Sequence, residues 1–556
     1  MRDGKKLVTQ ILYPKGEGPW PVILYRNPYN GWNSWIPSLR IWTRYGYVVV
    51  HQDVRGRFES EGEWTPLENE GPDGLDTIDW ILKQPWQDGN IGLWGASYLS
   101  GVQWAMGDQM PPEVKAMVSM VFGTDFYGAV YENGNFRHDV FTFWAALMAD
   151  SGLNLFNGRA YQKAIRHYPP LEADEAHFGH KIPWYRQWQQ SEEPTAPMWQ
   201  QEKAQLLRTL PDQLDKPVLM ITGWYDLFIK SQLDDFRRLT HQKDGAPRRT
   251  WAEQSRLVVG PWTHLMGVVG DGEKEHKNAG SVLQQTHLVL QWFDHYLKGK
   301  KHDFGSPMKV HAIGGKGWED ASSWPPATRG HRLYFQQVSK SPTCDGGRLD
   351  GFPQPSGESV QYVYDPRNPV PTRGGGPLLS HVIVGFGGPE PSNRDQAGLC
   401  ERPDVLSFTT PPLKEALHVA GEIQVSLSVS SSAEDTAFTA KVIEVDEKGK
   451  ALNIQDGITT VAHARQQAGL GPYVPGEKTP LTFSLWPLHW VAPKGARIRV
   501  DISSSNFPAY HAHANRRGPW AQQDKPIAAT QRLFVGADHL SYIEFPLVAP
   551  AGAEPR

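Results

Sequence analysis

GLWGASYLSG, Gly92–Gly101, is the stretch that decides the fold, because its serine lies where an apolar strand turns into a helix. The apolar run at residues 90–95 is typical of a buried strand, and a helical pattern follows the serine. A sharp strand–turn–helix connection exposes a serine hydroxyl and aims backbone N–H groups at the same point. The stretch begins like the G-x-S-x-G signature of serine hydrolases, although Leu99 stands at the second glycine position. Ser97 is therefore a candidate nucleophile, provided that a base and an orienting acid occur elsewhere in the chain.

Short apolar runs around this stretch predict a parallel sheet. Four of them occupy residues 22–26, 47–53, 90–95 and 115–121. Their near-continuous apolar character suits strands that are covered on both faces. A helical pattern at residues 73–84 separates the second run from the third, and this alternation of strand and helix indicates an α/β sheet.

The α/β pattern is interrupted once and then resumes. Aromatic and polar segments from about residue 126 to 213 predict short helices and no clear strand. Two more strands are predicted at residues 217–224 and 256–262, followed by a helix at 282–298. We therefore expect an α/β domain in two parts with an inserted helical cap domain. The expected ranges are 1–122 and 214–308 for the two parts, and 123–213 for the cap.

The last part of the chain has a different composition. After about residue 305, proline, glycine and serine separate short runs in which apolar and polar residues alternate. Examples are IQVSLSV at Ile423–Val429 and RIRVDIS at Arg497–Ser503. Short alternating strands between turn residues predict a jelly-roll β-sandwich domain over residues 309–556.

Bulk composition excludes several classes of partner. The chain has 556 residues and a net charge of -4, so nothing indicates an electrostatic contact with nucleic acid or an anionic membrane. No apolar run approaches the length of about 18 residues that a membrane-spanning helix needs. The polar start, MRDGKKLV, favours a cytoplasmic protein, or a secreted one whose leader has been removed. For the two cysteines, Cys344 and Cys400, we expect unlinked thiols, with a single bridge as the alternative.

Two further residues complete a candidate catalytic triad with Ser97. Asp226 closes one predicted strand, and His264 lies just past another. The carboxyl ends of parallel strands meet at one edge of a sheet, so all three side chains are expected at the same edge. The order serine, acid, histidine along the chain is also the order that this type of sheet uses. The three residues together are far more specific than the serine motif alone.

Acyl transfer also needs donors for the developing oxyanion. One donor is expected to be the N–H of Tyr98, the residue after the nucleophile. Tyr29 follows the first strong strand and could offer its hydroxyl, but from spacing alone a packed loop tyrosine is the better explanation. No cofactor is expected. His511 and His513 are too few to indicate a metal site, so no metal is expected either.

Segments along the whole chain resemble the family of α/β-hydrolases that contains bacterial cocaine esterase, X-Pro dipeptidyl-peptidases and α-amino-acid ester hydrolases. They include RNPY at 26–29, DVRGRFESEGEW at 53–64, GWYDLF at 223–228, VVGPWTHL at 258–265 and SSSNFP at 503–508. The resemblance is to the cocaine-esterase branch in particular. The elbow of the family reads G-x-S-Y-x-G, so Leu99 matches it, whereas Ser100 replaces its glycine. The loop Asp53–Arg57 is interpreted as structural.

The resemblance implies an α/β-hydrolase sheet with a helical cap and a C-terminal jelly roll. It implies Ser97, Asp226 and His264 as the triad and assigns the second oxyanion donor to Tyr29.

Amino-acid ester hydrolases carry acidic residues soon after the triad aspartate, whereas residues 227–229 here are apolar. We therefore expect a small-molecule ester substrate with a hydrophobic group, and a homodimer stays open. The alternatives are X-Pro dipeptidyl-peptidase activity, amide or β-lactam acylase activity, and a non-catalytic carbohydrate-binding protein.

Overall fold

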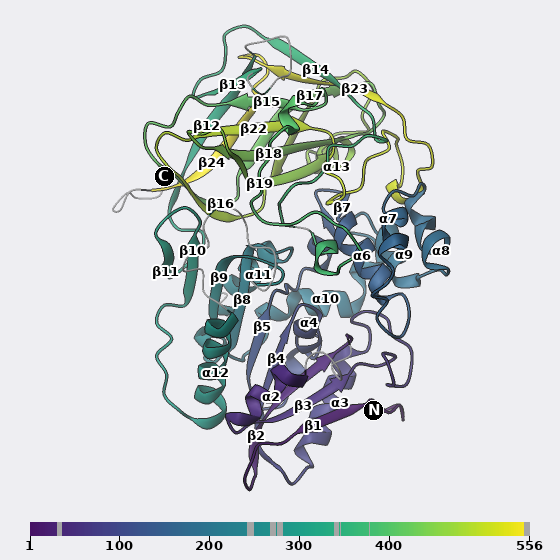
Figure 1. Ribbon diagram of the computed structural model, residues 1–556, viewed down its shortest axis with the longest axis vertical. Coiled ribbons are helices and arrows are strands. Elements are labelled where there is room, and N and C mark those ends of the chain that lie inside the picture. Colours follow the sequence, from purple (N-terminus) through teal and green to yellow (C-terminus); the bar gives the residue numbers. More distant parts are fainter. Residues whose placement is uncertain are drawn as a thin grey trace.

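The computed structural model describes residues 1–29, 36–241, 249–266, 274, 282–337, 344, 346–376 and 378–549. Its lower part in Figure 1 is a nine-stranded sheet in the order β1-β3-β2-β4-β5-β8-β9-β10-β11. The strands are β1 (Thr9–Leu12), β2 (Trp20–Asn27), β3 (Val48–Asp53), β4 (Gln87–Ala96), β5 (Val114–Met120), β8 (Val218–Tyr225), β9 (Arg256–Thr263), β10 (Met308–Ala312) and β11 (Gly317–Ala321). Neighbouring strands from β3 to β10 run parallel, and β1 and β11 are antiparallel edge strands. The predicted parallel α/β sheet is therefore confirmed.

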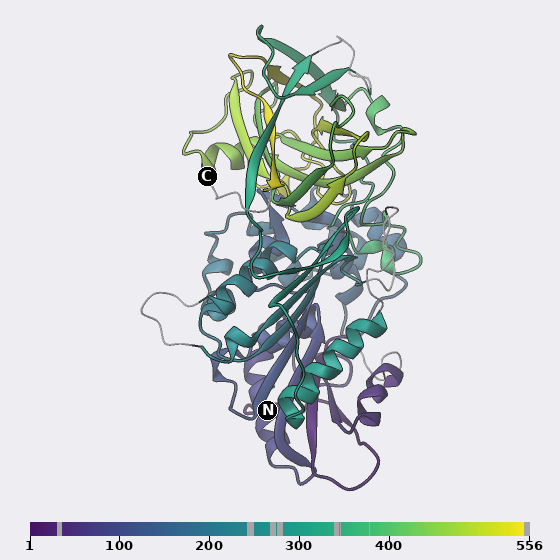
Figure 2. The same ribbon diagram turned by 90° about the vertical axis from the view of Figure 1, so that its left-hand side faces the viewer.

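Helices cover both faces of this sheet, which explains why its strands are apolar throughout. On β2, Val22 and Leu24 pack on the face that carries helix α3 (Glu70–Leu82). Ile23 and Tyr25 alternate with them and pack on the other face, where α2 (Ile36–Arg44) and the long α12 (Val282–Lys298) lie (Figure 2). Helix α11 (Ile229–Thr240) follows β8 on the α3 face. Because successive side chains of a strand point to opposite faces, a strand covered on both sides has no polar stripe.

Between β5 and β8 the chain forms the cap, on the right in Figure 1. Its helices are α5 (Phe126–Val130), α6 (His138–Met148), α7 (Gly158–Ala164), α8 (Ala173–Phe178), α9 (Pro183–Gln190) and α10 (Glu202–Thr209). The sequence predicts no clear strand here, but β6 (Tyr131–Glu132) and β7 (Asn135–Phe136) form a small hairpin. Asn133 and Gly134 connect them with positive φ angles of 46° and 78°, as a tight asparagine–glycine hairpin turn requires.

The C-terminal part is built of strands, as predicted (Figure 1). They are β12 (Thr328–Gln337), β13 (Gly347–Asp350), β14 (Glu358–Tyr364), β15 (Leu406–Thr409), β16 (Leu417–Gly421), β17 (Gln424–Ser431), β18 (Ala437–Val445), β19 (Ala451–Thr460), β20 (Thr479–Ser484), β21 (Leu488–Ala492), β22 (Arg497–Ser503), β23 (Ala529–Val535) and β24 (Tyr542–Val548). A short helix, α13 (Val461–Gln467), follows β19. The alternating apolar residues of β17 and β22 are buried in the core of this domain. Strands β10 and β11, between Met308 and Ala321, pair with the α/β sheet and not with the strands of the C-terminal part.

The expectation of two unlinked thiols is wrong. Cys344 and Cys400 form a disulfide within the C-terminal domain, with their Cα atoms 4.9 Å apart. The two residues are separated by 56 positions, so only the tertiary fold brings them together.

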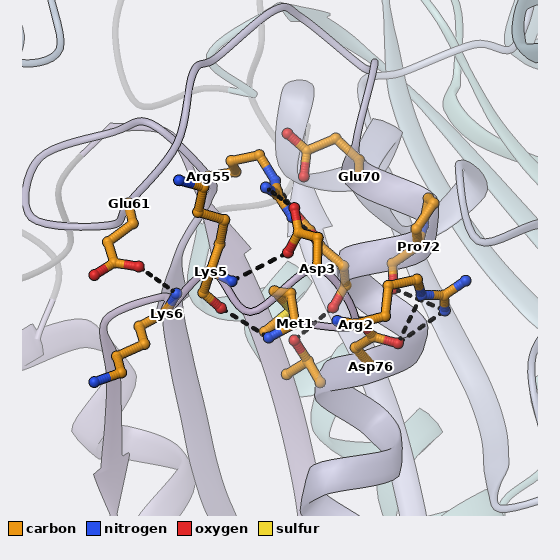
Figure 3. A network of polar contacts seen from close by, with 12 residues as sticks. Met1, Arg2, Asp3, Lys5, Lys6, Arg55, Glu61, Glu70, Pro72 and Asp76 are labelled. Atoms are coloured by element: carbon orange, nitrogen blue, oxygen red, sulfur yellow. Dashed lines mark hydrogen bonds and ion pairs between the residues drawn. The ribbon is translucent and has the colours of Figure 1, made fainter.

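The first residues of the chain pack against the α/β domain (Figure 3). Arg2 pairs with Asp76 of α3 at 2.8 Å, and Asp3 pairs with Arg55 at 2.6 Å. The N–H of Lys6 donates to Glu61.

In the described part of the chain, no helix has the length and apolar character needed to cross a membrane.

Candidate active site

Ser97 lies at a strained turn between β4 and helix α4 (Tyr98–Trp104). Its φ of 57° is in the left-handed region, which non-glycine residues rarely adopt. Gly95 permits the turn, because a Cβ atom at this position would lie 2.5 Å from the carbonyl oxygen of Leu99. The N–H of Ser97 donates to the Met120 carbonyl of β5 at 2.8 Å, which ties the turn to the sheet. This geometry is that of a nucleophile elbow.

Ser97, His264 and Asp226 form a continuous hydrogen-bonded series. The Oγ atom of Ser97 lies 2.8 Å from Nε2 of His264, and Nδ1 of His264 lies 2.5 Å from Oδ2 of Asp226. Asp226 is fully buried and His264 is 8% exposed. The second carboxylate oxygen of Asp226 accepts the N–H of Phe228 at 2.8 Å. The structure thus brings together the three side chains that the sequence pattern selects, from the ends of β4, β8 and β9.

The loop that carries Asp226 is also held by the cap. Arg137 is 2% exposed, and its guanidinium donates to the carbonyl of Leu227 at 2.9 Å. The same group lies 3.8 Å above the ring of Trp486 from the C-terminal domain and 3.4 Å from the carboxylate of Glu132. Burial raises the pKa of Glu132 to about 7, and the charge of Arg137 opposes that rise. The sequence gives no local signal for this contact, because its partners are distant along the chain.

Tyr29 lies beside Ser97 in the same cavity. Its hydroxyl oxygen accepts the indole N–H of Trp144 at 3.0 Å, and its backbone N–H donates to the Asn27 side chain at 2.7 Å. Burial raises the pKa of the Tyr29 hydroxyl to about 12, so this hydroxyl keeps its proton at neutral pH. Arg57 donates to the Pro28 carbonyl at 3.1 Å, which fixes the residue before Tyr29 and fits the structural interpretation of the Asp53–Arg57 loop.

Tyr98 is the first residue of α4 and directly follows Ser97, so its backbone N–H has no partner within the helix. Its side chain has a separate, structural role, because the hydroxyl donates to Glu70 at 2.7 Å and accepts the indole N–H of Trp64 at 3.1 Å and the backbone N–H of Leu67 at 3.0 Å. These contacts fix the start of α4 next to Ser97.

Ser100, which stands where the resembling family has glycine, is buried between α4 and β5. Its hydroxyl lies 2.5 Å from that of Ser119, and Ser119 also accepts the indole N–H of Trp104 at 2.9 Å. The added hydroxyl therefore has a partner, and the close contact of helix and sheet is preserved. Gly101 faces Phe122, where a Cβ atom would approach the ring to 2.9 Å.

A narrow, mostly apolar cavity of about 50 Å³ lies at Ser97. All three parts of the chain line it: Phe228 comes from the α/β domain, Trp144 from the cap and Leu379 from the C-terminal part. None of the described residues that line this cavity is acidic. The described part of the chain also contains no group of three or more side chains that could hold a metal ion, and His513 lies 3.3 Å from Asp435 instead.

An α/β sheet with a serine, a histidine and an aspartate bonded in series at its strand ends defines the class of α/β serine hydrolases. The family described as X-Pro dipeptidyl-peptidase (S15 family) matches residues 3–266, and the X-Pro dipeptidyl-peptidase C-terminal non-catalytic domain matches residues 302–544. Cocaine esterase from Rhodococcus sp. (strain MB1 Bresler) is 32% identical, over an alignment covering 99% of this chain and 97% of that protein. The chain belongs to the X-Pro dipeptidyl-peptidase S15 family of serine hydrolases.

Solved structures share this fold over nearly the whole chain. An aminopeptidase from a marine sediment archaeon, Thaumarchaeota archaeon, aligns with a TM-score of 0.82 and 24% identity, covering 99% of this chain and 95% of that chain. An α-amino acid ester hydrolase aligns with a TM-score of 0.81 and 24% identity, covering 98% and 95%. The predicted family resemblance and fold class are therefore confirmed.

Proposed function

We propose that this protein hydrolyses carboxylic esters through an acyl-serine intermediate. Ser97 is the nucleophile, His264 is the general base and then the general acid, and Asp226 orients and stabilises the imidazolium. The observation that carries the proposal is the hydrogen-bonded series from Ser97 Oγ through the His264 ring to the Asp226 carboxylate.

The reaction proceeds in two balanced halves. Ser97 Oγ attacks the ester carbonyl carbon while its proton passes to His264 Nε2, and a tetrahedral oxyanion forms. The bond to the alcohol oxygen then breaks, and His264 returns the proton to the departing alcohol. Water attacks the acyl-serine in the same way, and the carboxylic acid leaves with Ser97 regenerated.

Two donors serve the oxyanion in this proposal, namely the Tyr29 hydroxyl and the Tyr98 N–H. The Tyr29 hydroxyl oxygen already accepts a hydrogen bond from Trp144, so its own proton is the part that can point to the substrate. Its pKa of about 12 supports this role, because a deprotonated tyrosine could not donate. Each donor is worth about 3 kcal/mol of barrier reduction.

The cavity lining supports an ester with a hydrophobic group over a peptide with a free amino terminus. A substrate ammonium beside the reacting carbonyl needs a carboxylate partner, and the described residues that line the cavity at Ser97 offer none. Leu227 and Phe228 present apolar surface directly after Asp226. Cocaine esterase, the relative at 32% identity, carries ester hydrolysis in its name, which agrees with this preference.

Labelling with a fluorophosphonate probe tests the nucleophile directly. We expect labelling of the wild-type protein and none of Ser97→Ala, together with loss of 4-nitrophenyl acetate hydrolysis. Ser100→Ala is the matched control, because this serine lies three residues after Ser97, in α4, and contacts Ser119 of β5. Labelling of Ser97→Ala, or faster cleavage of an alanyl-prolyl anilide than of the ester, contradicts the proposal.

A further inference from the structure

A second and larger cavity lies next to the one at Ser97. It measures about 380 Å³, against about 50 Å³ at the serine itself. It lies between the α/β domain and the cap, where helix α10 passes close to the end of α4 (Figure 1). The cavity at Ser97 is too small for both halves of a sizeable ester, because sites for drug-sized ligands measure about 300–1,000 Å³.

Apolar and charged side chains both line the larger cavity. The apolar ones include Leu75 and Met106 from the α/β domain and Met198, Trp199 and Leu207 from the cap. Lys203 of α10 forms an ion pair with Glu68 of the α/β domain, and both side chains are about half exposed. The other charged lining residues, Arg2, Arg208, Asp125 and Glu202, also include both signs, so the lining favours a neutral occupant with apolar surface.

The two cavities share a boundary made of three residues, Pro66, Phe126 and Trp188. The rings of Phe126 and Trp188 lie 5.3 Å apart. Trp144 stacks on Trp188 at 5.7 Å and on Tyr98 at 6.0 Å, so a row of aromatic rings leads from the oxyanion side of Ser97 to this boundary. Phe126 is only partly buried, and its ring can turn without breaking a hydrogen bond.

We propose that the larger cavity is the acyl-chain site of this enzyme, and that its substrates are esters of extended, apolar carboxylic acids. The inference rests on the proposed function. His264 must protonate the departing alcohol, so the alcohol oxygen faces the imidazole and the acyl chain extends away from it. The row of rings that includes Trp144 and Trp188 begins on the Tyr98 side of Ser97. Phe228 lies on the His264 side, with its ring 6.0 Å from the His264 ring. The acyl chain therefore crosses the boundary at Phe126 into the larger cavity.

Substitutions that fill or open this cavity test the proposal. Ala204 of α10 lines it and is partly buried, so Ala204→Trp fills it. Gln190→Trp is the matched control, because it adds the same side chain at an exposed cap position outside the lining. Phe126→Ala widens the shared boundary. The readout is kcat/KM for 4-nitrophenyl acetate and 4-nitrophenyl octanoate, which share one alcohol and differ only in acyl length.

Each buried methylene group is worth about fourfold in affinity. We expect Ala204→Trp to lower the octanoate-to-acetate ratio of kcat/KM by about tenfold or more, and Gln190→Trp to leave it unchanged. Phe126→Ala should raise the ratio. A series of acetate esters with lengthening alcohols should not respond to Ala204→Trp.

Two results overturn the acyl-site proposal. One is an unchanged octanoate-to-acetate ratio in a folded Ala204→Trp variant, whether or not both esters lose activity equally, and the other is a response confined to the alcohol series. These results are distinct from failure of the proposed function, which would appear as undiminished hydrolysis by Ser97→Ala. Calorimetric binding of octanoate to Ser97→Ala provides a readout without turnover, and Ala204→Trp in that background should weaken it.

Discussion

Removing the Tyr29 hydroxyl tests the proposed role of Tyr29 as an oxyanion donor, because loss of such a donor should affect kcat much more than KM. In Tyr29→Phe the ring and its packing are retained, and only one oxygen is lost. That oxygen accepts the Trp144 indole N–H at 3.0 Å, and in the proposed mechanism its proton is donated to the substrate oxyanion. The Tyr98 N–H cannot be removed by substitution, so Tyr29 is the one donor of this pair that mutation can test.

The expected loss follows from the geometry. An oxyanion donor acts mainly on the charged intermediate, so its removal costs about 10²–10³ in kcat, or about 2.7–4 kcal/mol. The neutral ground-state carbonyl is held less by this contact, so KM should change by only a few fold. The Trp144 N–H is left without its acceptor, which adds a stability cost of about 1–3 kcal/mol.

Steady-state kinetics with 4-nitrophenyl acetate, together with thermal unfolding of the same preparation, measures both effects. Trp144→Phe is the informative control, because it removes the donor to Tyr29 but leaves the tyrosine proton. We expect it to lower kcat much less than Tyr29→Phe does. Wild-type kcat in a folded Tyr29→Phe variant, or a change confined to KM, would refute the oxyanion assignment.

Three further changes have consequences that can be measured. Arg137→Lys keeps the charge but cannot reproduce the planar guanidinium that donates to the Leu227 carbonyl. We expect the loss of this charge-assisted hydrogen bond to lower kcat about tenfold, while circular dichroism shows that the fold is retained. His51 is buried and its folded-state pKa is about 4, against about 6.5 when unfolded. The contribution of His51 to the free energy of unfolding should therefore be constant above pH 6.5 and fall as the pH drops towards 4, by up to about 3 kcal/mol. In chemical denaturation, His51→Gln should flatten this pH dependence. Reduction of the Cys344–Cys400 bridge opens a loop of 56 residues and should cost about 4 kcal/mol, seen as a lower unfolding temperature in dithiothreitol; an unchanged temperature contradicts it.

The α/β domain could be read from the sequence because its signals are local. Strands covered on both faces are continuously apolar, and the serine, aspartate and histidine each follow such a run. The hairpin at residues 131–136 also had a local signal, since Asn133 and Gly134 form the dipeptide that favours a two-residue turn. Its strands have only two residues each, which is too short for any periodicity to appear.

The rest of the site depends on contacts between distant parts of the chain. Trp144 reaches Tyr29 across 115 positions, and Arg137 reaches Leu227 across 90. The disulfide likewise depends on a pairing that no spacing rule gives for two isolated cysteines. Such contacts are fixed by how the domains pack, so they become visible only in the folded structure.

The residues on either side of Asp226 connect the candidate active site to the cap and to the C-terminal domain. Tyr225, immediately before it, donates from its hydroxyl to the Ile454 carbonyl of the C-terminal domain at 3.1 Å. Leu227, immediately after it, is held by Arg137 of the cap. The segment that carries the carboxylate bonded to His264 is therefore held on both sides by domains outside the α/β sheet. An isolated α/β domain would keep the three triad residues but lose both supports, and small displacements of a catalytic group cost large factors in rate. The proposed catalysis is therefore expected to depend on all three domains.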